Sequence, residues 1–292
     1  MCMRDNMNNG PKLSTTNPGI PIGISDFKEM RDGSYYYIDK TDFISEIVNA
    51  SAKVILLPRP RRFGKTLNMS MLRYFFEKSE EGLRDIFTGL AICHQEAFSK
   101  QGEYPVIWLT FKDARNNTWA GCEKSIQDII YEEYARHRYL LESDALYAEE
   151  KDYILNIINK TLEQTEYERA LKYLSVYLHR HHQERVIILI DEYDAPLHAG
   201  YTYGYYDDVM NFMRNFLSGG LKDNEHLFKG VLTGILRVAK ESVFSGLNNL
   251  GVYTLLVPRF SNSFGFTESE VRSLLQDYNM GDHYDKVSQW YN

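Results

Sequence analysis

The stretch that decides the fold is Val54-Ile-Leu-Leu-Pro-Arg-Pro-Arg-Arg-Phe-Gly-Lys-Thr66. Its first part completes an apolar run, Lys53–Leu57, with the length and composition of a strand that is buried on both faces. A short basic turn follows, and apolar residues then recur at helical spacing over Asn68–Lys78. The stretch therefore predicts a buried strand, a tight loop and a helix that opens at Thr66.

A loop between a buried strand and a helix is suited to phosphate binding, because backbone N–H groups and the positive end of the helix dipole face the same point. The end of this loop, Gly64-Lys-Thr66, resembles the Walker A pattern G-x-x-x-x-G-K-[ST], although Arg59 occupies the first glycine position. We expect Lys65 to reach the β- and γ-phosphates and Thr66 to bind Mg²⁺. The alternative is a surface turn with solvated arginines. The expected nucleotide contacts are Arg59, Pro60, Arg61, Arg62, Phe63, Gly64, Lys65, Thr66 and Leu67.

An acidic sequence ends a second apolar run, Val186–Ile190, which continues into Asp-Glu-Tyr-Asp194. Open α/β sheets bind their ligands at the carboxyl ends of the strands, so carboxylates are well placed there for a ligand. Asp191 is expected to hold Mg²⁺, and Glu192 to act as general base toward an attacking water. The alternative is a solvated strand end. A phosphate loop and a metal-binding carboxylate together are what phosphoryl transfer requires.

A third apolar run, Gly230–Ile235, also ends in polar residues. Thr233 is a candidate sensor that hydrogen-bonds the γ-phosphate or the attacking water. Arg237 is a candidate for the positive charge that stabilises the transition state. The alternatives are an ordinary β-branched strand residue for Thr233 and a solvated loop for Arg237 and Lys240.

Strand-length apolar runs alternate with helix-period stretches along the chain, which predicts an α/β fold with a mainly parallel sheet between helices. Two further strands are expected at Val106–Phe111 and Tyr253–Val257. Residues of about 122–182 are too long for a single crossover, so we expect a helical insertion of two or three helices between the second and third strands. Another helix is expected over Asp208–Leu217, and residues 1–19 are expected to form a disordered leader.

Composition narrows the function classes. The chain has 292 residues, of which 43% are hydrophobic and 25% charged, which excludes disordered, collagen-like and disulfide-scaffold proteins. With 33 basic and 40 acidic residues the net charge is −7, which disfavours binding to nucleic acid or anionic membranes through overall charge. Three cysteines without metal-binding spacing, and the lack of a signal or membrane-spanning stretch, predict a cytoplasmic protein with no membrane partner.

Several of these segments together resemble the bacterial and archaeal AAA-ATPase-like family of P-loop proteins, whose phosphate loop also has the form RPRRFGKT. The resemblance implies a P-loop NTPase fold of the AAA/ASCE type, with five strands in the order 5-1-4-3-2 and helices on both faces. This order would place Lys65, Asp191 and Thr233 around one phosphate. The matching segments are Ile20–Phe27, Tyr36–Thr41, Arg59–Thr66, Asp191–Asp194, residues 234–250 and Phe264–Glu268.

The resemblance also divides the chain. It implies a nucleotide-binding domain over residues 20–262 and the start of a truncated helical lid over residues 263–292, with a helix at about Glu268–Tyr278. Ile20–Thr41 is expected to contact the base or ribose side of the nucleotide; the alternative is that it caps a helix, with Asp39–Thr41 at the start of that helix. Family members often carry a C-terminal PD-(D/E)XK nuclease-like domain, and this sequence has no such arrangement. We therefore expect no nuclease activity here and a separate nuclease-like or effector protein as partner.

The function that these features predict is binding of ATP, with slow Mg²⁺-dependent hydrolysis of its β–γ phosphoanhydride, so that the nucleotide state acts as a conformational switch. One rival is a nucleotide-binding module that does not hydrolyse ATP. Another is a nucleic-acid-binding protein that uses Arg61, Arg62 and Arg73 with Phe63. A single bound nucleotide accounts for the same charges, so direct nucleic-acid binding is the weaker expectation.

Overall fold

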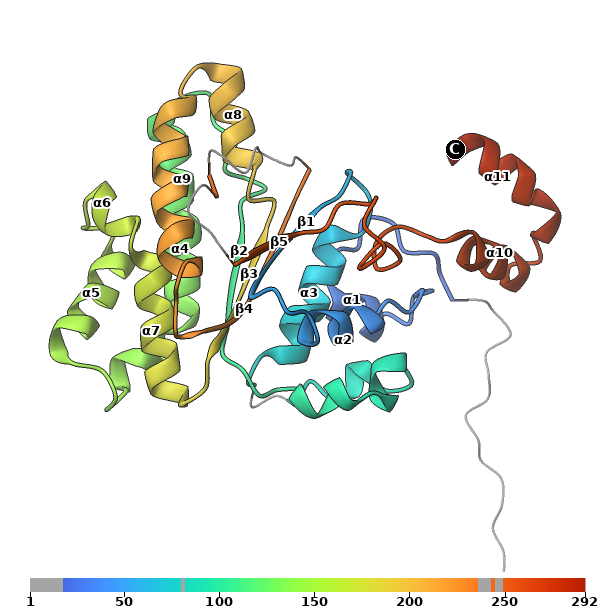
Figure 1. Cartoon of the computed structure of the whole chain (residues 1–292), viewed down its shortest axis with the longest axis horizontal. Coiled ribbons are helices and arrows are strands. Elements are labelled where there is room, and N and C mark those ends of the chain that lie inside the picture. Colours follow the sequence, from blue (N-terminus) through green and yellow to red (C-terminus); the bar gives the residue numbers. More distant parts are fainter. Residues whose placement is uncertain (1–17, 80–81, 236–242, 245–248, 292) are drawn as a thin grey trace, which may run out of the picture.

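A five-stranded parallel sheet forms the centre of the molecule, in the order β2-β3-β4-β1-β5 (Figure 1). The computed structural model describes residues 18–79, 82–235, 243–244 and 249–291. The order is the expected 5-1-4-3-2, read from the opposite edge, and every strand pair is parallel. The strands are β1 (Val54–Pro58), β2 (Val106–Thr110), β3 (Val186–Asp191), β4 (Leu227–Gly234) and β5 (Leu250–Val252).

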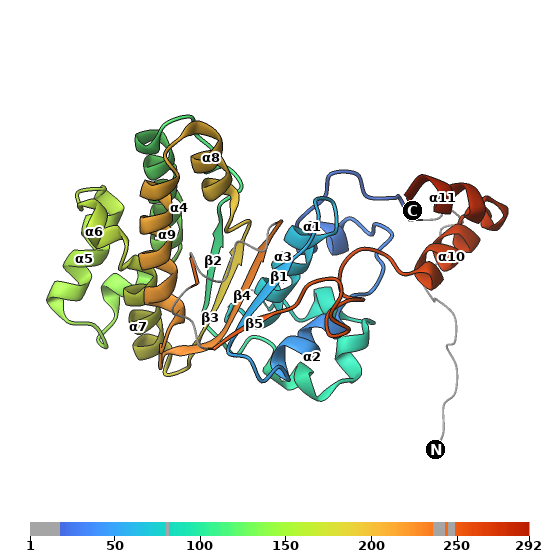
Figure 2. The same ribbon diagram turned by 45° about the horizontal axis from the view of Figure 1, so that its top comes forward.

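Helices cover both faces of this sheet (Figures 1 and 2). Residues of β1 alternate between two apolar cores, because successive side chains of a strand point to opposite faces. Ile55 and Leu57 pack toward α1, α2 and α3, whereas Val54 and Leu56 pack toward α4, α7 and α9. These helices are α1 (Phe27–Asp32), α2 (Asp42–Val48), α3 (Lys65–Phe76), α4 (Trp119–Arg136), α7 (Ala170–His182) and α9 (Tyr206–Leu221).

The helical insertion expected over residues 122–182 lies between β2 and β3. It holds three helices of at least three turns, α4, α5 (Ala148–Asn159) and α7, together with the single turn α6 (Gln164–Tyr167). Their apolar residues reach one core with the strands, so the insertion packs directly on the sheet. Short 3-10 helices occur at Asp85–Phe87, Ala91–His94, Glu96–Lys100, Arg138–Glu142 and Gly281–His283.

The expected fifth strand was misplaced. β5 consists of Leu250–Val252, whereas the predicted run Tyr253–Val257 leaves the sheet after the backbone N–H of Tyr253 donates to the carbonyl of Leu56 at 2.9 Å. Leu256 is 94% exposed, which shows that this apolar run does not enter the core. The prediction rested on the alternation of strands and on apolar composition, and composition alone does not reveal where a chain turns away from an edge strand.

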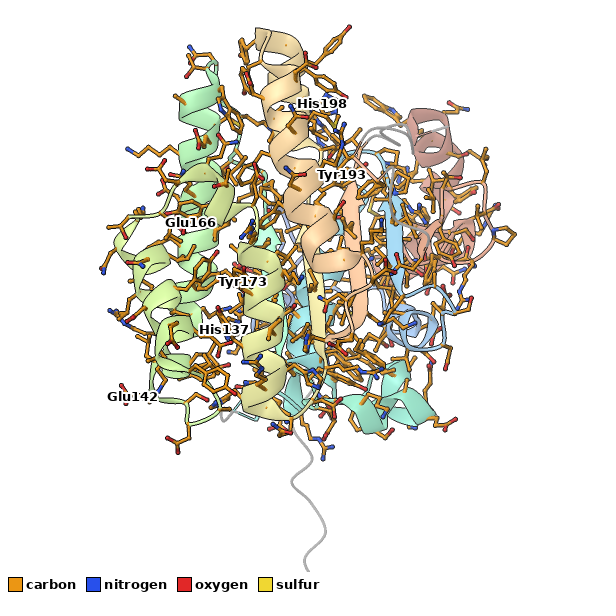
Figure 3. The ribbon with its side chains drawn as sticks, turned by 60° about the vertical axis from the view of Figure 1, so that its left-hand side comes forward. His137, Glu142, Glu166, Tyr173, Tyr193 and His198 are labelled. Atoms are coloured by element: carbon orange, nitrogen blue, oxygen red, sulfur yellow. The ribbon has the colours of Figure 1, made fainter. Side chains whose placement is uncertain are left out.

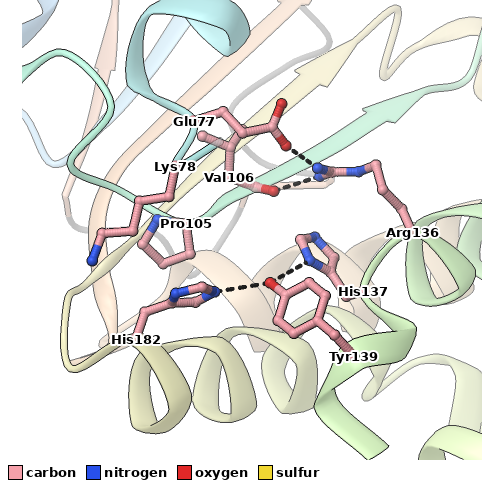
Figure 4. Close-up of a pocket in the computed structure, with 8 residues that line it drawn as sticks. All are labelled: Glu77, Lys78, Pro105, Val106, Arg136, His137, Tyr139 and His182. Carbon is pink, nitrogen blue, oxygen red and sulfur yellow. Dashed lines mark hydrogen bonds and ion pairs between the residues drawn. The ribbon is translucent and has the colours of Figure 1, made fainter. Parts of the chain in front are cut away.

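The free edge of the sheet at β2 is covered by side chains of α4 (Figure 4). The backbone N–H of Trp108 donates to Glu133 Oε1 at 2.8 Å, and Arg136 donates to the carbonyl of Val106 at 2.5 Å. Arg136 also binds Glu133 Oε1 at 2.6 Å. An unpaired strand edge is a template for aggregation, so this ion pair protects the edge while it satisfies its backbone groups.

Two C-terminal helices, α10 (Glu268–Asp277) and α11 (Tyr284–Tyr291), lie apart from the sheet at one side of the molecule (Figure 1). Thr267 is the N-cap of α10 and forms a capping box with Glu270. The hydroxyl of Tyr36 donates to Asp277 at 2.6 Å and so joins α10 to the N-terminal segment. None of the helices in the described residues has the length and apolar character needed to cross a membrane.

Candidate nucleotide-binding site

The candidate site lies at the carboxyl edge of the sheet, where β1, β3 and β4 end side by side. Leu57 of β1 is opposite Thr233 of β4, and Ile190 of β3 is opposite Leu232 of β4. The residues that follow these strands therefore meet at one place, as the sequence predicted. Figure 3 shows the start of α8 (Ala195–Tyr203), marked by Tyr193 and His198, at this end of the sheet and His137 at the opposite end.

Residues 59–66, which comprise the loop after β1 and the first two residues of α3, supply a helix N-terminus. We call them the 59–66 loop. Gly64 has φ 75° and Arg62 has φ 65°, so two left-handed residues curve the backbone just before α3. Gly64 is the N-cap of α3, and no side-chain hydrogen bond caps this helix. The first N–H groups of a helix have no partner within it, so those of α3 are available to an anion. α3 begins at Lys65, one residue earlier than predicted.

Lys65 lies inside this loop. Its side chain is buried, and its ammonium group donates to the carbonyls of Pro60 at 3.0 Å and Arg59 at 3.3 Å. Burial lowers the pKa of Lys65, and the nearby carboxylates of Asp191, Glu192 and Asp194 act in the opposite direction. The ammonium group is thus held at the strand ends by weak carbonyl contacts.

The five loop residues before Gly64 differ in their exposure. Arg61 and Arg62 are exposed, as is Pro60, and Phe63 is half-buried. Arg59 is fully buried, and its guanidinium donates to the carbonyls of Pro58, Tyr253 and Phe260. A bound nucleotide would therefore meet the side chains of Arg61 and Arg62, whereas Arg59 offers it only its backbone.

The carboxylate of Asp191 joins three elements. One oxygen, Oδ2, accepts a hydrogen bond of 2.7 Å from the hydroxyl of Thr66 on α3. The other, Oδ1, accepts from the hydroxyl of Thr233 on β4 and from the backbone N–H of Glu192. Asp191 and Thr233 are fully buried. These donors are neutral, and no Lys or Arg side chain of the described residues forms an ion pair with this carboxylate, which leaves it suited to bind a cation.

Glu192 sits in a strained position directly after β3. Its φ is 50°, in the left-handed region that non-glycine residues rarely adopt. Its carboxylate binds the guanidinium of Arg115 at 2.6 Å, and Arg115 lies in the segment between β2 and α4. Arg115 is a site residue that we did not predict. A signal in the sequence was available, because Arg115 follows the edge strand β2 just as the predicted site residues follow β1, β3 and β4.

Asp194 is 1% exposed and fixes the end of β4. Its Oδ2 accepts from the backbone N–H of Ile235 at 2.9 Å. A Cβ atom at Gly234 would lie 2.6 Å from Asp194 Oδ1, so only glycine allows this approach. Asp194 therefore fixes Gly234 and Ile235 at the end of β4. The candidate residues Arg237 and Lys240 lie outside the described residues.

The Tyr37–Thr41 segment packs near the amino end of α2. Asp39 accepts from the backbone N–H groups of Thr41 and Ala91, and Thr41 is the N-cap of α2 but makes no side-chain capping bond. Lys40 binds Glu270 at 2.6 Å. Contact of this segment with a base or ribose stays a prediction.

The residues at this edge fit ATP with Mg²⁺. A free helix N-terminus and a buried ammonium suit a phosphate chain, and a hydroxyl bonded to a carboxylate offers the hard oxygen ligands that Mg²⁺ prefers. The residues that would hold the cation are Thr66 and Asp191, and those that would hold the phosphates are Lys65 and the N–H groups around Gly64.

Comparisons with known proteins agree with this architecture. A protein-family model described as Predicted AAA-ATPase matches residues 21–244. A curated relative from Azotobacter chroococcum mcd 1, described as an uncharacterized protein in the vnfD 5′ region, is 29% identical over 279 residues. That alignment covers 94% of this chain and 48% of the relative, so the chain spans about half of that relative's length. No solved structure matches the chain. Because the family match covers most of the chain and includes the ends of β1, β3 and β4, this protein belongs to the predicted AAA-ATPase family.

Proposed function

We propose that this protein binds Mg·ATP at the carboxyl edge of its sheet and hydrolyses it slowly, as a conformational switch in the cytoplasm. The observation that carries the proposal is the convergence of Thr66, Asp191 and Thr233, which come from three elements and share one buried carboxylate. A buried carboxylate is costly, and this one is held by neutral hydroxyls. An incoming cation would supply the missing opposite charge.

Phosphate binding is proposed to move the ammonium group of Lys65. The group now donates to two loop carbonyls, which are neutral acceptors. A phosphate oxygen carries formal charge and makes a shorter, stronger hydrogen bond with an ammonium. Lys65 would therefore leave the carbonyls of Arg59 and Pro60 for the phosphate, and the exposed Arg61 and Arg62 would add charge at the outer side of the loop.

Thr66 and Asp191 are the proposed cation ligands. When bound, Mg²⁺ would supply positive charge to the oxygens of the β- and γ-phosphates. The oxygen of the Thr66 hydroxyl would then bind the cation, and the hydrogen bond from this hydroxyl to Asp191 would be given up. Thr233 would continue to orient the carboxylate of Asp191 through Oδ1. The existing hydrogen bonds thus hold both ligands on the same side of the sheet before any ligand arrives.

Glu192 is the proposed general base. Its carboxylate would accept a proton from a water whose oxygen attacks the γ-phosphorus, while the bond from this phosphorus to the β–γ bridging oxygen breaks and ADP leaves. The ion pair with Arg115 occupies the carboxylate of Glu192, so this contact would have to loosen before the carboxylate could accept a proton from the water. We propose that the weakening of this pair limits the rate, which accounts for slow turnover.

The test compares equilibrium binding of Mg·ATP and steady-state turnover in the wild type, Lys65→Ala, Glu192→Gln and Arg115→Met. We expect binding to weaken at least ten-fold in Lys65→Ala, because one charged phosphate contact is worth more than about 1.4 kcal/mol. Glu192→Gln should bind normally and lose turnover, and Arg115→Met should raise turnover several-fold at unchanged affinity. Unchanged binding and turnover in both Lys65→Ala and Glu192→Gln would refute the proposal.

A further inference from the structure

Arg59 occupies an unexpected place for a residue of the 59–66 loop. Its side chain is 0% exposed and turns away from the loop, toward residues 253–265, which connect β5 to α10 and which we call the strap. One guanidinium nitrogen donates to the carbonyl of Tyr253 at 2.7 Å, and another to that of Phe260 at 3.0 Å. The guanidinium also lies over the ring of Phe264 at 4.9 Å. Arg59 therefore binds the strap at three points.

The charge of Arg59 is not neutralised by an ion pair. No carboxylate of the described residues lies within ion-pair distance of it, and its Nε has no hydrogen-bond partner among them. Burial lowers the pKa of Arg59 to about 10, so the group stays protonated at neutral pH. A buried guanidinium is expensive to desolvate, and an apolar side chain would fill the same space without that cost. What an arginine provides at this position, and an apolar side chain does not, is hydrogen bonds to several carbonyls of another segment at once.

Two further bonds join the strap to the same loop and to the helix that follows it. Asn68, in the second turn of α3, donates to the carbonyl of Ser263 at 2.6 Å, and both residues are about 5% exposed or less. The backbone N–H of Gly265 donates to the carbonyl of Phe63 at 3.2 Å. The strap is thus attached before, within and after the turn that would receive a phosphate.

The far end of the strap is attached to α10. Lys40 donates to the carbonyl of Asn262 at 2.7 Å and binds the carboxylate of Glu270, in the first turn of α10, at 2.6 Å. Figures 1 and 2 show the strap passing the β1–α3 connection on its way to α10. A change in the packing of the strap therefore reaches the start of α10 through Lys40.

The link to nucleotide is the peptide of Arg59 itself. Its carbonyl accepts from the ammonium of Lys65 at 3.3 Å, whereas its side chain holds the strap. On the function proposed above, a bound phosphate draws Lys65 off this carbonyl, so the same residue meets the ligand on one side and the strap on the other. An equilibrium coupling of this kind is reciprocal: if nucleotide favours one packing of the strap, that packing favours nucleotide to the same degree.

We propose that Arg59 is a positioning residue that couples the 59–66 loop to the strap, so that nucleotide binding and ordered packing of residues 253–265 stabilise each other. This inference rests on the proposed nucleotide binding and adds to it a route from the loop to α10. Arg59 takes no part in the chemistry.

The experiment measures hydrogen exchange of the peptides that cover residues 253–277 in the full chain, with and without Mg²⁺ and a non-hydrolysable ATP analogue. Calorimetric titration of the same samples measures nucleotide affinity. In the wild type we expect nucleotide to slow exchange of the strap at least five-fold. In Arg59→Met this slowing should be lost and affinity should fall about ten-fold. Arg59→Lys, which keeps the charge but not the planar fork, should recover part of both.

Arg259→Met is the matched control. Arg259 is also an arginine of the strap, but its guanidinium donates to the carbonyl of Glu46 in α2 and lies over the ring of Phe260 within the strap. It should speed exchange of the strap without nucleotide and keep the slowing that nucleotide causes. Should Arg59→Met not fold, as judged by circular dichroism, Asn68→Ala decides instead, because it removes a separate bond between the strap and α3 and should halve the response or more.

The outcomes are distinct. Binding in the wild type without a change in strap exchange, or a full response in Arg59→Met or in the substitute Asn68→Ala, overturns the coupling and leaves the proposed function standing. A wild type that binds no nucleotide in the titration overturns the proposed function, and the coupling with it.

Discussion

The amino ends and the carboxyl ends of the strands, which we call the amino edge and the carboxyl edge of the sheet, hold buried polar clusters that differ in how their carboxylates are bound. At the amino edge the carboxylate of Glu133 is bound by Arg136 and by His137, around a pocket of about 170 Å³ (Figure 4). At the carboxyl edge the carboxylate of Asp191 is bound by two hydroxyls and one backbone N–H. One buried acid has a fixed cationic partner, and the other forms no ion pair within the part of the chain that the structure describes.

The helix ends differ in the same way. α3, α4 and α7 all end beside the amino-edge pocket, where the guanidinium of Arg136, in the last turn of α4, offsets the negative end of that helix dipole. Burial alone would raise the pKa of Glu133, but Arg136 and His137 outweigh it and lower this pKa to about 2. At the carboxyl edge α3 begins without a capping side chain. At the amino edge the buried carboxylate is already paired with a cationic side chain. At the carboxyl edge the N-terminus of α3 can bind an anion, and the carboxylate of Asp191 can bind a cation.

Asp191→Asn should produce the largest functional loss. The amide keeps the size of the side chain. Its oxygen can still accept from Thr233 and from the backbone N–H of Glu192, and its NH2 group can donate to the hydroxyl oxygen of Thr66 in place of the bond that Thr66 now donates, so stability should change by less than about 1 kcal/mol. Loss of the negative charge should reduce Mg²⁺-dependent turnover by roughly 100-fold or more, because cation ligands supply several kcal/mol. Turnover is measured at saturating Mg·ATP. Wild-type turnover in this variant would remove the distinction between the two edges.

Glu133→Gln should give the reverse result. It leaves the partly buried Arg136 without one of its two carboxylate partners and changes the buried acceptor of the Trp108 N–H, which together cost about 3 kcal/mol in the free energy of unfolding. Nucleotide affinity of the folded protein should not change. Urea denaturation measures the loss, and Glu132→Gln, at the exposed neighbouring position, is the control. A stability equal to that of the control would mean that the ion pair at the β2 edge does not hold the insertion on the sheet.

Thr233→Val tests the hydroxyl contacts of Asp191 with a side chain of the same shape. A hydrogen bond to a charged group contributes about 1.5–3 kcal/mol, so turnover should fall about ten-fold or more. Thr233→Ser keeps the hydroxyl and should stay close to wild type. Equal rates for Thr233→Val and Thr233→Ser would assign Thr233 to packing alone.

His182 gives the smallest effect, at the amino edge. Burial and the nearby charges of His181, Lys78 and His137 lower the pKa of His182 to about 4, against about 6.5 in an unfolded chain. Between these values the unfolded chain binds more protons, so the free energy of unfolding should decrease as pH falls from 6.5 to 4.

The part due to His182 is roughly 1 kcal/mol, after allowance for its partial exposure. Denaturation of the wild type and His182→Asn at several pH values separates it from other histidines. The variant should show a shallower pH dependence, and parallel curves would contradict the assignment.

The sequence predicted much of this site because the relevant residues follow apolar runs directly. Asp191 and Thr233 stand at the end of a buried strand, and Lys65 begins the helix that follows one. A parallel sheet brings such ends together, whatever the intervening segments do. The strand order came from the family resemblance. The helical insertion was predicted from its length and its helical periodicity.

The rest depends on contacts that no local pattern reveals. Arg59 binds carbonyls that lie 194 and 201 residues away along the chain, so its inward turn could not be deduced from the loop. Glu192 pairs with Arg115 only because β2 lies beside β3 and because a positive φ directs its side chain. The strand predicted over Tyr253–Val257 failed for a similar reason, since its apolar residues face solvent after the chain leaves the sheet.

The most direct test of the central claim, that the carboxyl edge binds and hydrolyses Mg·ATP, is a single-turnover experiment. Wild-type protein in excess over labelled ATP is mixed with Mg²⁺ and quenched at intervals, with Glu192→Gln in parallel. We predict that the wild type converts its bound ATP to ADP and phosphate, while Glu192→Gln holds it intact. Recovery of intact bound ATP from the wild type over hours would contradict hydrolysis and leave a protein that only binds the nucleotide.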